Sequence, residues 1–202
     1  MIRASRWMLA AAMLAASVAT VSAQQATTRL RGTIEKTDGN VLTLKAADGA
    51  VIRLTLAANA RVVVVLKASM ADIKPGTFLG SAAMPQPDGS QKALEVHIFP
   101  EAMRGTGEGH RPYAPVPNST MTNGTADATV AGIDGSVMTV KYKNGEKKII
   151  VPPGVPIVRY EIGNLGDLKP GARFTVLAAT KKPDGTFEAN RINVGRDGVV
   201  PN

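Results

Sequence analysis

An internal repeat limits the folds that this chain can adopt. The segment Gly32-Thr-Ile-Glu-Lys-Thr-Asp38-Gly39-Asn-Val-Leu-Thr-Leu-Lys45 superimposes on Ala128–Lys141 at an offset of 96. The same offset matches Asp48-Gly49 with Asn144-Gly145 and Pro87–Gly89 with Pro183–Gly185, and an offset of 95 matches Asp72–Gly76 with Asp167–Gly171. Asp-Gly and Asn-Gly pairs supply the positive φ angles of tight hairpins, so matched turns at matched spacing predict two copies of one domain. The copies cover 28–100 and 125–197.

Alternation of apolar and polar residues predicts strands within each copy. Leu42 and Leu44 share one strand face, and Ile52, Leu54 and Leu56 repeat the pattern after the turn at 48–49. Further strands are expected near 30–36, 62–66, 78–84 and 93–99. Each copy therefore has five or six strands in about 70 residues, which predicts an all-β chain.

The segment 68–76 has room for one short helical turn that ends at Pro75-Gly76. A three-stranded meander, a short helix and a final hairpin follow one another in the small Greek-key barrel called the OB-fold. We expect two tandem OB-like β-barrels after a cleaved signal peptide, with an SH3-like barrel or a small sandwich as alternative closures.

The pattern G-T-I-x-x-x-D-G-N-x-L-T-L, followed by D-G, D-I-K-P-G and P-D-G, resembles exported bacterial OB-like domains of unknown function. The resemblance covers both copies and implies the fold. Met103–Tyr113 followed by Ser119–Thr125 is similar to a proteobacterial family often labelled metal ABC transporter permease. A permease needs several spanning helices, and none is expected after the N-terminal segment. That second resemblance implies at most a soluble role near metal transport.

The N-terminal segment has the order of a secretory signal peptide. Arg3 and Arg6 precede the apolar run 7–16, and Val21-Ser22-Ala23 forms a small-residue cleavage site. A membrane anchor is the alternative, but the apolar run is short and rich in alanine. We therefore predict cleavage after residue 23, a periplasmic or secreted location, and a protein that is not integral to the membrane.

The composition excludes several chemistries. The absence of cysteine removes disulfides, thiolate metal sites and a cysteine nucleophile. Without Arg3 and Arg6 the chain keeps 22 basic against 16 acidic residues, a net charge of +6. This surplus suits an anionic envelope ligand or an envelope protein, whereas the export signal and the few aromatic residues argue against nucleic acid.

The segment 101–124 differs most from the repeat and is the candidate contact surface. Arg104, Glu108, His110, Arg111 and Tyr113 are its candidate ligand-contacting residues. The simpler interpretation is a Gly/Pro-rich interdomain linker, flexible or extended, pinned to a barrel by Pro112 and Tyr113. We favour the linker interpretation.

A metal site is the alternative interpretation of the two histidines. Glu95 and His97 point the same way on one strand and could join His110, Glu101 or Glu108 around a divalent transition metal. The simpler interpretation places His97 on an exposed strand face, because Leu94, Val96 and Ile98 occupy the opposite one. In the second copy Asn190 and Asn193 lie nearby without a histidine.

No constellation of nucleophile and base, and no opposed pair of carboxylates, is recognisable in the sequence. The aspartates at 38, 88, 134 and 184 are explained by turn geometry. The leading hypothesis is an exported, non-enzymatic binding or interaction module of two OB-like domains that needs no cofactor. The alternatives are a periplasmic metal-binding accessory protein and a hydrolase whose polar pocket forms only on folding.

Overall fold

A computed structural model describes residues 27–132 and 135–201, and it is all-β. Strands and three short 3₁₀ helices are its regular elements, and the described residues contain no α-helix. None of the helices in this part of the chain has the length and apolar character needed to cross a membrane. The predicted signal peptide, residues 1–23, lies outside the described residues.

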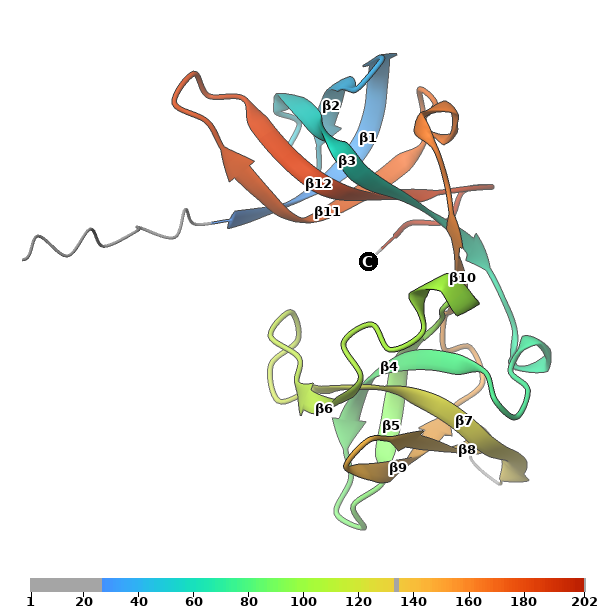
Figure 1. Cartoon of the computed structure of the whole chain (residues 1–202). Helices are drawn as coiled ribbons and strands as arrows, with labels where there is room; N and C mark the ends of the chain where they lie inside the picture. The colour runs from blue at the N-terminus through green and yellow to red at the C-terminus, as the bar shows by residue number, and fades with distance from the viewer. Residues whose placement is uncertain (1–26, 133–134, 202) are drawn as a thin grey trace, which may run out of the picture.

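The elements follow one another along the chain with these bounds: β1 (Thr27–Asp38), β2 (Val41–Ala46), β3 (Val51–Lys67), η1 (Met70–Asp72), β4 (Phe78–Pro85), β5 (Gln91–Ile98), η2 (Glu101–Met103), β6 (Gly109–Pro112), β7 (Thr120–Gly132), β8 (Gly135–Tyr142), β9 (Gly145–Val151), β10 (Ile157–Ile162), η3 (Leu165–Asp167), β11 (Arg173–Lys181) and β12 (Phe187–Gly195). The strands form two barrels, one above the other in Figure 1.

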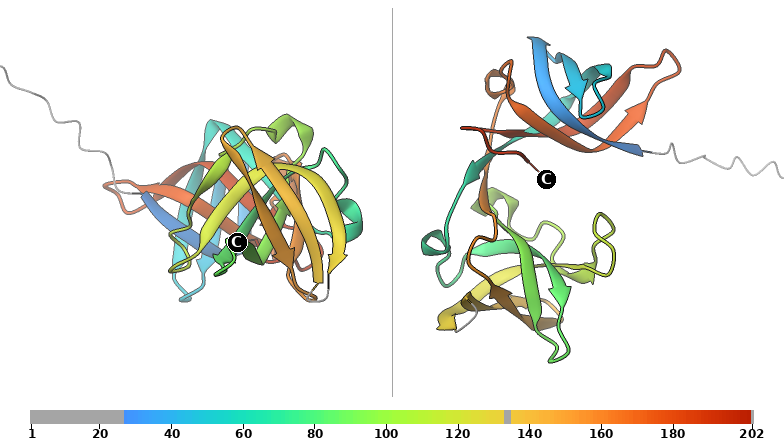
Figure 2. Two further views of the ribbon diagram at one scale, coloured as in Figure 1. Left: turned by 90° about the horizontal axis from the view of Figure 1, so that it is seen from below. Right: turned by 180° about the vertical axis from the view of Figure 1, so that it is seen from behind.

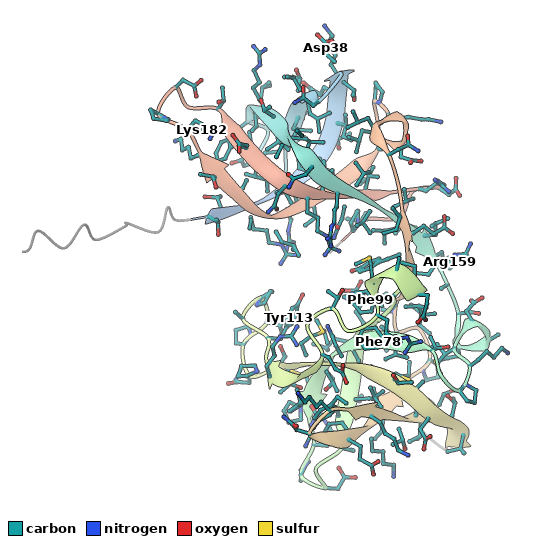
Figure 3. All side chains as sticks on the ribbon, viewed as in Figure 1. Asp38, Phe78, Phe99, Tyr113, Arg159 and Lys182 are labelled. Carbon is teal, nitrogen blue, oxygen red and sulfur yellow. The ribbon has the colours of Figure 1, made fainter. Side chains whose placement is uncertain are left out.

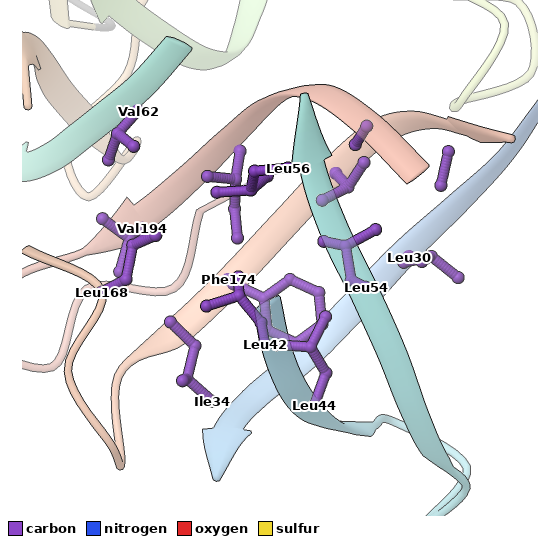
Figure 4. Packing of buried hydrophobic residues seen from close by; sticks show 14 of the residues in the cluster. Leu30, Ile34, Leu42, Leu44, Leu54, Leu56, Val62, Leu168, Phe174 and Val194 are labelled. Carbon is purple, nitrogen blue, oxygen red and sulfur yellow. The ribbon is translucent and has the colours of Figure 1, made fainter. Parts of the chain in front are cut away.

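The first barrel closes in the order β1–β2–β3–β12–β11 and back to β1. Its β3–β12 pair is parallel and the other four pairs are antiparallel. Alternate side chains of these strands fill the interior, as Figure 4 shows. The central members of the core are Ile34, Leu42, Leu44, Leu54, Leu56, Phe174, Val176, Ile192 and Val194. Leu42, Leu44, Leu54 and Leu56 were expected on one buried face, and all four are buried.

The second barrel closes in the order β7–β8–β9–β5–β4 and back to β7. The parallel β5–β9 contact is short and consists of two residue pairs. The core of this barrel contains Leu79, Val96, Ala126, Met138, Val140, Ile149 and Val151. Met138 therefore belongs to the core, as predicted from its alignment with Leu42 in the sequence repeat.

The barrels do not correspond to the expected ranges 28–100 and 125–197, because each contains strands from both. The hairpin β4–β5 pairs with β7 and β9, whereas β11–β12 pairs with β1 and β3. The reason is the length of β3. An unbroken strand of 17 residues extends about 55 Å, so it carries the chain out of the first barrel before the next hairpin forms. Figure 2 shows this path from two further directions.

Two strands, β3 and β10, hold the barrels together. They pair antiparallel, with Leu66 opposite Arg159 and Val63 opposite Ile162. Around this seam Val63, Val65 and Tyr160 form a third apolar cluster together with Met103, Val158 and the partly buried Phe99 and Val199. The seam therefore has a small hydrophobic core of its own.

Prolines explain why the second half of the chain has two separate strands, β9 and β10, where the first half has the single strand β3. Pro152, Pro153 and Pro156 lie between β9 and β10, and proline cannot donate a hydrogen bond to a sheet ladder. The equivalent stretch of β3 reads Leu56-Ala-Ala-Asn-Ala-Arg61 and contains no proline. It therefore stays extended.

The register of β7 corrects the sequence alignment. The offset of 96 matches Gly32 with Ala128, but Thr33 faces Lys45 and Thr125 faces Lys141. Gly32 and Gly124 hence have equivalent positions. A Cβ at Gly32 would lie 1.9 Å from the carbonyl oxygen of Lys45, and a Cβ at Gly124 would lie 2.3 Å from that of Lys141. The first strands match at an offset of 92, because the β7–β8 hairpin is four residues longer than the β1–β2 hairpin.

Two of the turn aspartates, Asp88 and Asp184, hydrogen-bond within their turns as predicted. Asp88 Oδ1 accepts a hydrogen bond from Ser90 N at 3.0 Å, and Asp184 Oδ1 accepts one from Thr186 N at 2.9 Å. Each precedes a glycine with positive φ. Asp134 lies outside the described residues.

Asp167 caps η3, and its charge should stabilise the fold. Its pKa is held below the usual range by the backbone N–H of Asn164 and by Arg196. A carboxylate with a lowered pKa contributes stability that is present above its unfolded pKa of about 3.9 and is lost as pH falls through the folded value. We expect Asp167→Asn to lower the melting temperature at pH 7, and the difference from the wild type to shrink below about pH 4. Thermal melts at pH 7 and pH 2.5 test this; an undiminished difference at pH 2.5 would show that the charge is not responsible.

Candidate binding cleft

The segment 101–124 joins β5 to β7, and both strands flank β4 in the second barrel. It is therefore a connection within one barrel, whereas the sequence predicts a linker between two. It also has regular structure: η2 is followed by β6, whose residues Gly109–Pro112 pair with 120–123 of β7. The chain passes between the barrels through 67–78 and 151–173 instead.

Arg104 and Glu108 fix this segment to the second barrel. Arg104 Nε lies 2.6 Å from Glu101 Oε1, its Nη2 donates to Gly76 O at 3.0 Å, and its guanidinium lies 5.7 Å from the ring centre of Phe78. Glu108 Oε1 accepts a hydrogen bond from Lys143 N at 3.0 Å in the β8–β9 turn. These two candidate ligand-contacting residues thus have local partners of their own.

His110 also has a partner within the barrel. Its Nδ1 lies 2.8 Å from Thr122 Oγ1 of β7, and partial burial together with the charge of Lys147 lowers its pKa. Because His110 pairs with Thr122 and Thr122 with Ser81, its side chain lies on the inner face of the sheet, next to two buried hydroxyls.

Arg111 and Tyr113 are the two candidates that reach a cleft between the barrels. The cleft has a volume of about 350 Å³. It is lined by Arg29, His97, Phe99, Thr106, Arg111, Tyr113, Pro115, Met121, Asn123, Tyr160, Leu177, Arg191 and Asn193. In Figure 3, Phe99 and Tyr113 lie on the side of the second barrel that faces the first. We call this space the inter-barrel cleft.

Glu95 and His97 point the same way, as predicted, but the face is covered. Glu95 is 8 % and His97 6 % exposed, and the two side chains approach to 3.0 Å between Oε1 and Nε2. The prediction that this strand face is exposed is therefore wrong, because the cleft wall and the segment 101–124 cover it. Leu94 is instead 38 % exposed, because a bulge between Ala82 and Ala83 leaves it without a partner on β4.

Glu95 and His97 of the predicted metal site do not lie near His110. His97 faces Gly80 of β4, Gly80 faces Asn123 of β7, and Asn123 faces Gly109 of β6. His110 is one residue beyond this row, so it lies on the opposite sheet face and about 14 Å away, which is three strand spacings. Among the described residues, no three His, Cys, Asp or Glu side chains gather closely enough to hold a metal ion.

Aromatic rings form one wall of the cleft. The His97 and Tyr160 rings stack with centres 5.3 Å apart, and Phe99 meets Tyr160 edge to face at 5.4 Å. Burial and the neighbouring Glu95 raise the pKa of Tyr160, so its hydroxyl stays protonated at neutral pH. This wall offers flat apolar surface with a hydrogen-bond donor.

Guanidinium groups come to the cleft from both barrels. Arg29 lies at a bulge of β1, between Thr28 and Leu30, and Arg191 lies at a register shift of β12. Arg191 Nε donates to Asn193 Oδ1 at 3.0 Å, and Arg111 Nη1 donates to Gly107 O at 2.6 Å. Burial and the charge of Arg61 lower the pKa of Arg191. The ion pairs between described residues include none of these three arginines.

Incomplete hydrogen bonding singles out the same cleft. In the described part of the chain, three buried side-chain polar atoms have no hydrogen-bond partner: Arg29 Nε, His97 Nε2 and Asn123 Oδ1. All three residues line the inter-barrel cleft. His97 Nε2 is within ion-pair distance of Glu95 but lacks the alignment of a hydrogen bond. Native structures leave few such atoms, so their gathering at one place indicates a site that binds something polar.

Arg29, Tyr160 and Arg191 belong to no motif that marks them as site residues in the sequence. One signal was present: at the offset of 96, Glu95 and His97 correspond to Arg191 and Asn193. Side chains of opposite charge, Glu95 and Arg191, thus occupy positions that this offset matches, one in each barrel. Searches of known protein families, of curated proteins and of solved structures each found no match to this chain.

Proposed function

We propose that this protein is an exported, non-enzymatic binding protein that holds a small molecule in the inter-barrel cleft. The observation that carries the proposal is the gathering of three buried, unpartnered polar atoms in one cleft of about 350 Å³. That volume lies at the lower end of the range for small-molecule sites. Export rests on the segment 1–23, and it places the ligand in the cell envelope or outside the cell.

The barrels are proposed to be OB-like units that have exchanged their final hairpins. The first barrel closes as strands 1-2-3-5-4-1 when β11 and β12 are counted as strands 4 and 5, with strands 3 and 5 parallel. This order, with a short helix before strand 4, supports an OB-like assignment. Tandem duplication of one domain followed by exchange accounts for both the repeat and the pairing.

Binding at the cleft uses residues of both halves. Arg29 and Arg191 belong to the first barrel, and His97 and Asn123 to the second. A site built across two such units is asymmetric, since the equivalent positions 97 and 193, which both line the cleft, carry histidine and asparagine. It therefore suits a ligand with two chemically different ends.

The proposal predicts a bound small molecule on protein isolated from its own cell envelope. Native mass spectrometry without chelators should show the chain from residue 24 with one small organic adduct. Arg191→Met should lose the adduct, and Arg53→Met, which removes an exposed charge from β3, should keep it. Adduct-free wild-type protein would contradict the proposal. A stoichiometric metal ion that is lost on His97→Ala would favour the metal-binding alternative.

A further inference from the structure

The charges of the inter-barrel cleft point to an anionic ligand. Arg29, Arg111 and Arg191 line it, and no carboxylate belongs to its lining. Other basic side chains, such as Lys141, Lys182 and Arg196, have carboxylate partners within 4 Å. Arg29 and Arg191 are half-buried and Arg111 is exposed at the rim of the cleft. Half-buried guanidinium groups without such partners favour a ligand that supplies the negative charge, and planar guanidinium suits a planar oxyanion.

The apolar part of the lining favours a flat ring. Phe99, Tyr113 and Tyr160 border the cleft together with Met121 and Leu177. Leu177 is 51 % exposed, which is unusual for a large apolar residue beside a buried aromatic cluster. A flat ring placed against these side chains would bury apolar surface.

Asn123 favours a ligand that carries a hydrogen-bond donor. Its Nδ2 donates to Thr106 O at 2.9 Å, which fixes the amide orientation and leaves Oδ1 as a buried acceptor without a partner. Asn123 is 5 % exposed. A hydroxyl group on the ligand would satisfy this oxygen, whereas Arg29 Nε needs an acceptor.

We infer that the inter-barrel cleft binds a small aromatic carboxylate that carries a ring hydroxyl. The carboxylate is bound by the arginines, the ring lies against the aromatic wall, and the hydroxyl donates to Asn123. This inference rests on the proposed binding function and names the class of its ligand.

Isothermal titration calorimetry with 4-hydroxybenzoate tests the inference. We expect binding of one molecule per chain. The neutral 4-hydroxybenzamide should bind at least about tenfold more weakly, because it cannot form charge-assisted hydrogen bonds with arginine. Benzoate should bind about fivefold more weakly, because it leaves Asn123 Oδ1 without a donor. Equal affinity for benzoate would overturn the assignment of the hydroxyl.

Variants distinguish binding in the cleft from non-specific attraction to surface charge. Arg191→Met and Arg29→Met should each weaken 4-hydroxybenzoate about tenfold, and the exposed Arg53→Met should leave it unchanged. The unliganded melting temperature of Arg191→Met should stay close to that of the wild type, because the change removes both a cation disfavoured by burial and its hydrogen bond to Asn193 Oδ1. Equal weakening by Arg53→Met would overturn the cleft assignment.

The two proposals fail in different ways. If phenyl phosphate binds at least tenfold more tightly than 4-hydroxybenzoate, the ligand is a phosphate and the carboxylate class is wrong. If no probe binds while envelope-isolated protein carries an adduct that Arg191→Met loses, the ligand class is wrong and the binding function stands. If neither probe nor adduct is found, both proposals are wrong.

Discussion

Fragments 24–117 and 118–202 should not form closed barrels separately but should associate one to one when mixed. Each fragment contains a meander whose closing hairpin lies in the other fragment, since β11–β12 closes the first barrel and β4–β5 the second. A separate fragment leaves long strand edges unpaired, which favours aggregation or pairing with a second copy. The proposed cut lies in an exposed loop between Pro117 and Asn118, outside the strands.

Size-exclusion chromatography with light scattering and circular dichroism tests this prediction. The mixture should elute at the mass of one full chain and unfold in one transition, and each fragment alone should lack that transition. Two stable monomeric fragments would show that each copy can close on itself. The observed strand pairing would then be only one of two accessible arrangements.

Phe174→Ala should destabilise the whole molecule by about 3–5 kcal/mol, the usual cost of removing a buried aromatic side chain. Phe174 is 1 % exposed and lies in the first core with Leu42 and Leu54. Its strand β11 comes from the second half of the chain, whereas Leu42 and Leu54 come from the first. The cavity therefore weakens the contact that joins the two halves.

Urea unfolding followed by circular dichroism measures the effect. We expect a single transition that shifts to lower urea, because β3 and β10 connect the barrels. The control Val51→Ala removes a side chain that is 67 % exposed on β3 of the same barrel, and it should change stability by less than about 0.5 kcal/mol. Two separate transitions, of which only one moves, would contradict the coupling of the barrels.

The local elements could be predicted from the sequence because their causes are local. Alternation placed Leu42, Leu44, Leu54 and Leu56 in the core, and Asp-Gly pairs marked the hairpins. The same reasoning failed for Leu94, where a bulge changes the face, and for the first strands, where a longer hairpin changes the offset. Bulges depend on the neighbouring strand, and a sequence pattern does not record them.

The candidate site was predicted only in part. Arg111 and Tyr113 line the cleft, while Arg104, Glu108 and His110 make local contacts in the second barrel. Arg29 and Arg191 are 162 residues apart in the chain and meet at one cleft. Their proximity depends on β3 leaving its own barrel.

Hydrophobic periodicity and turn residues act over a few positions, so the alternation of strands and turns and the similarity of the two halves can be read from the sequence alone. Which hairpin closes which barrel depends on contacts between strands that lie far apart in the chain. Each barrel could be closed by the hairpin of its own half or by the hairpin of the other half. Both pairings satisfy equivalent backbone hydrogen bonds and bury equivalent apolar faces, so local pattern does not distinguish them. The continuous path of β3 and the apolar seam with β10 distinguish them, and the same path creates the cleft between the barrels.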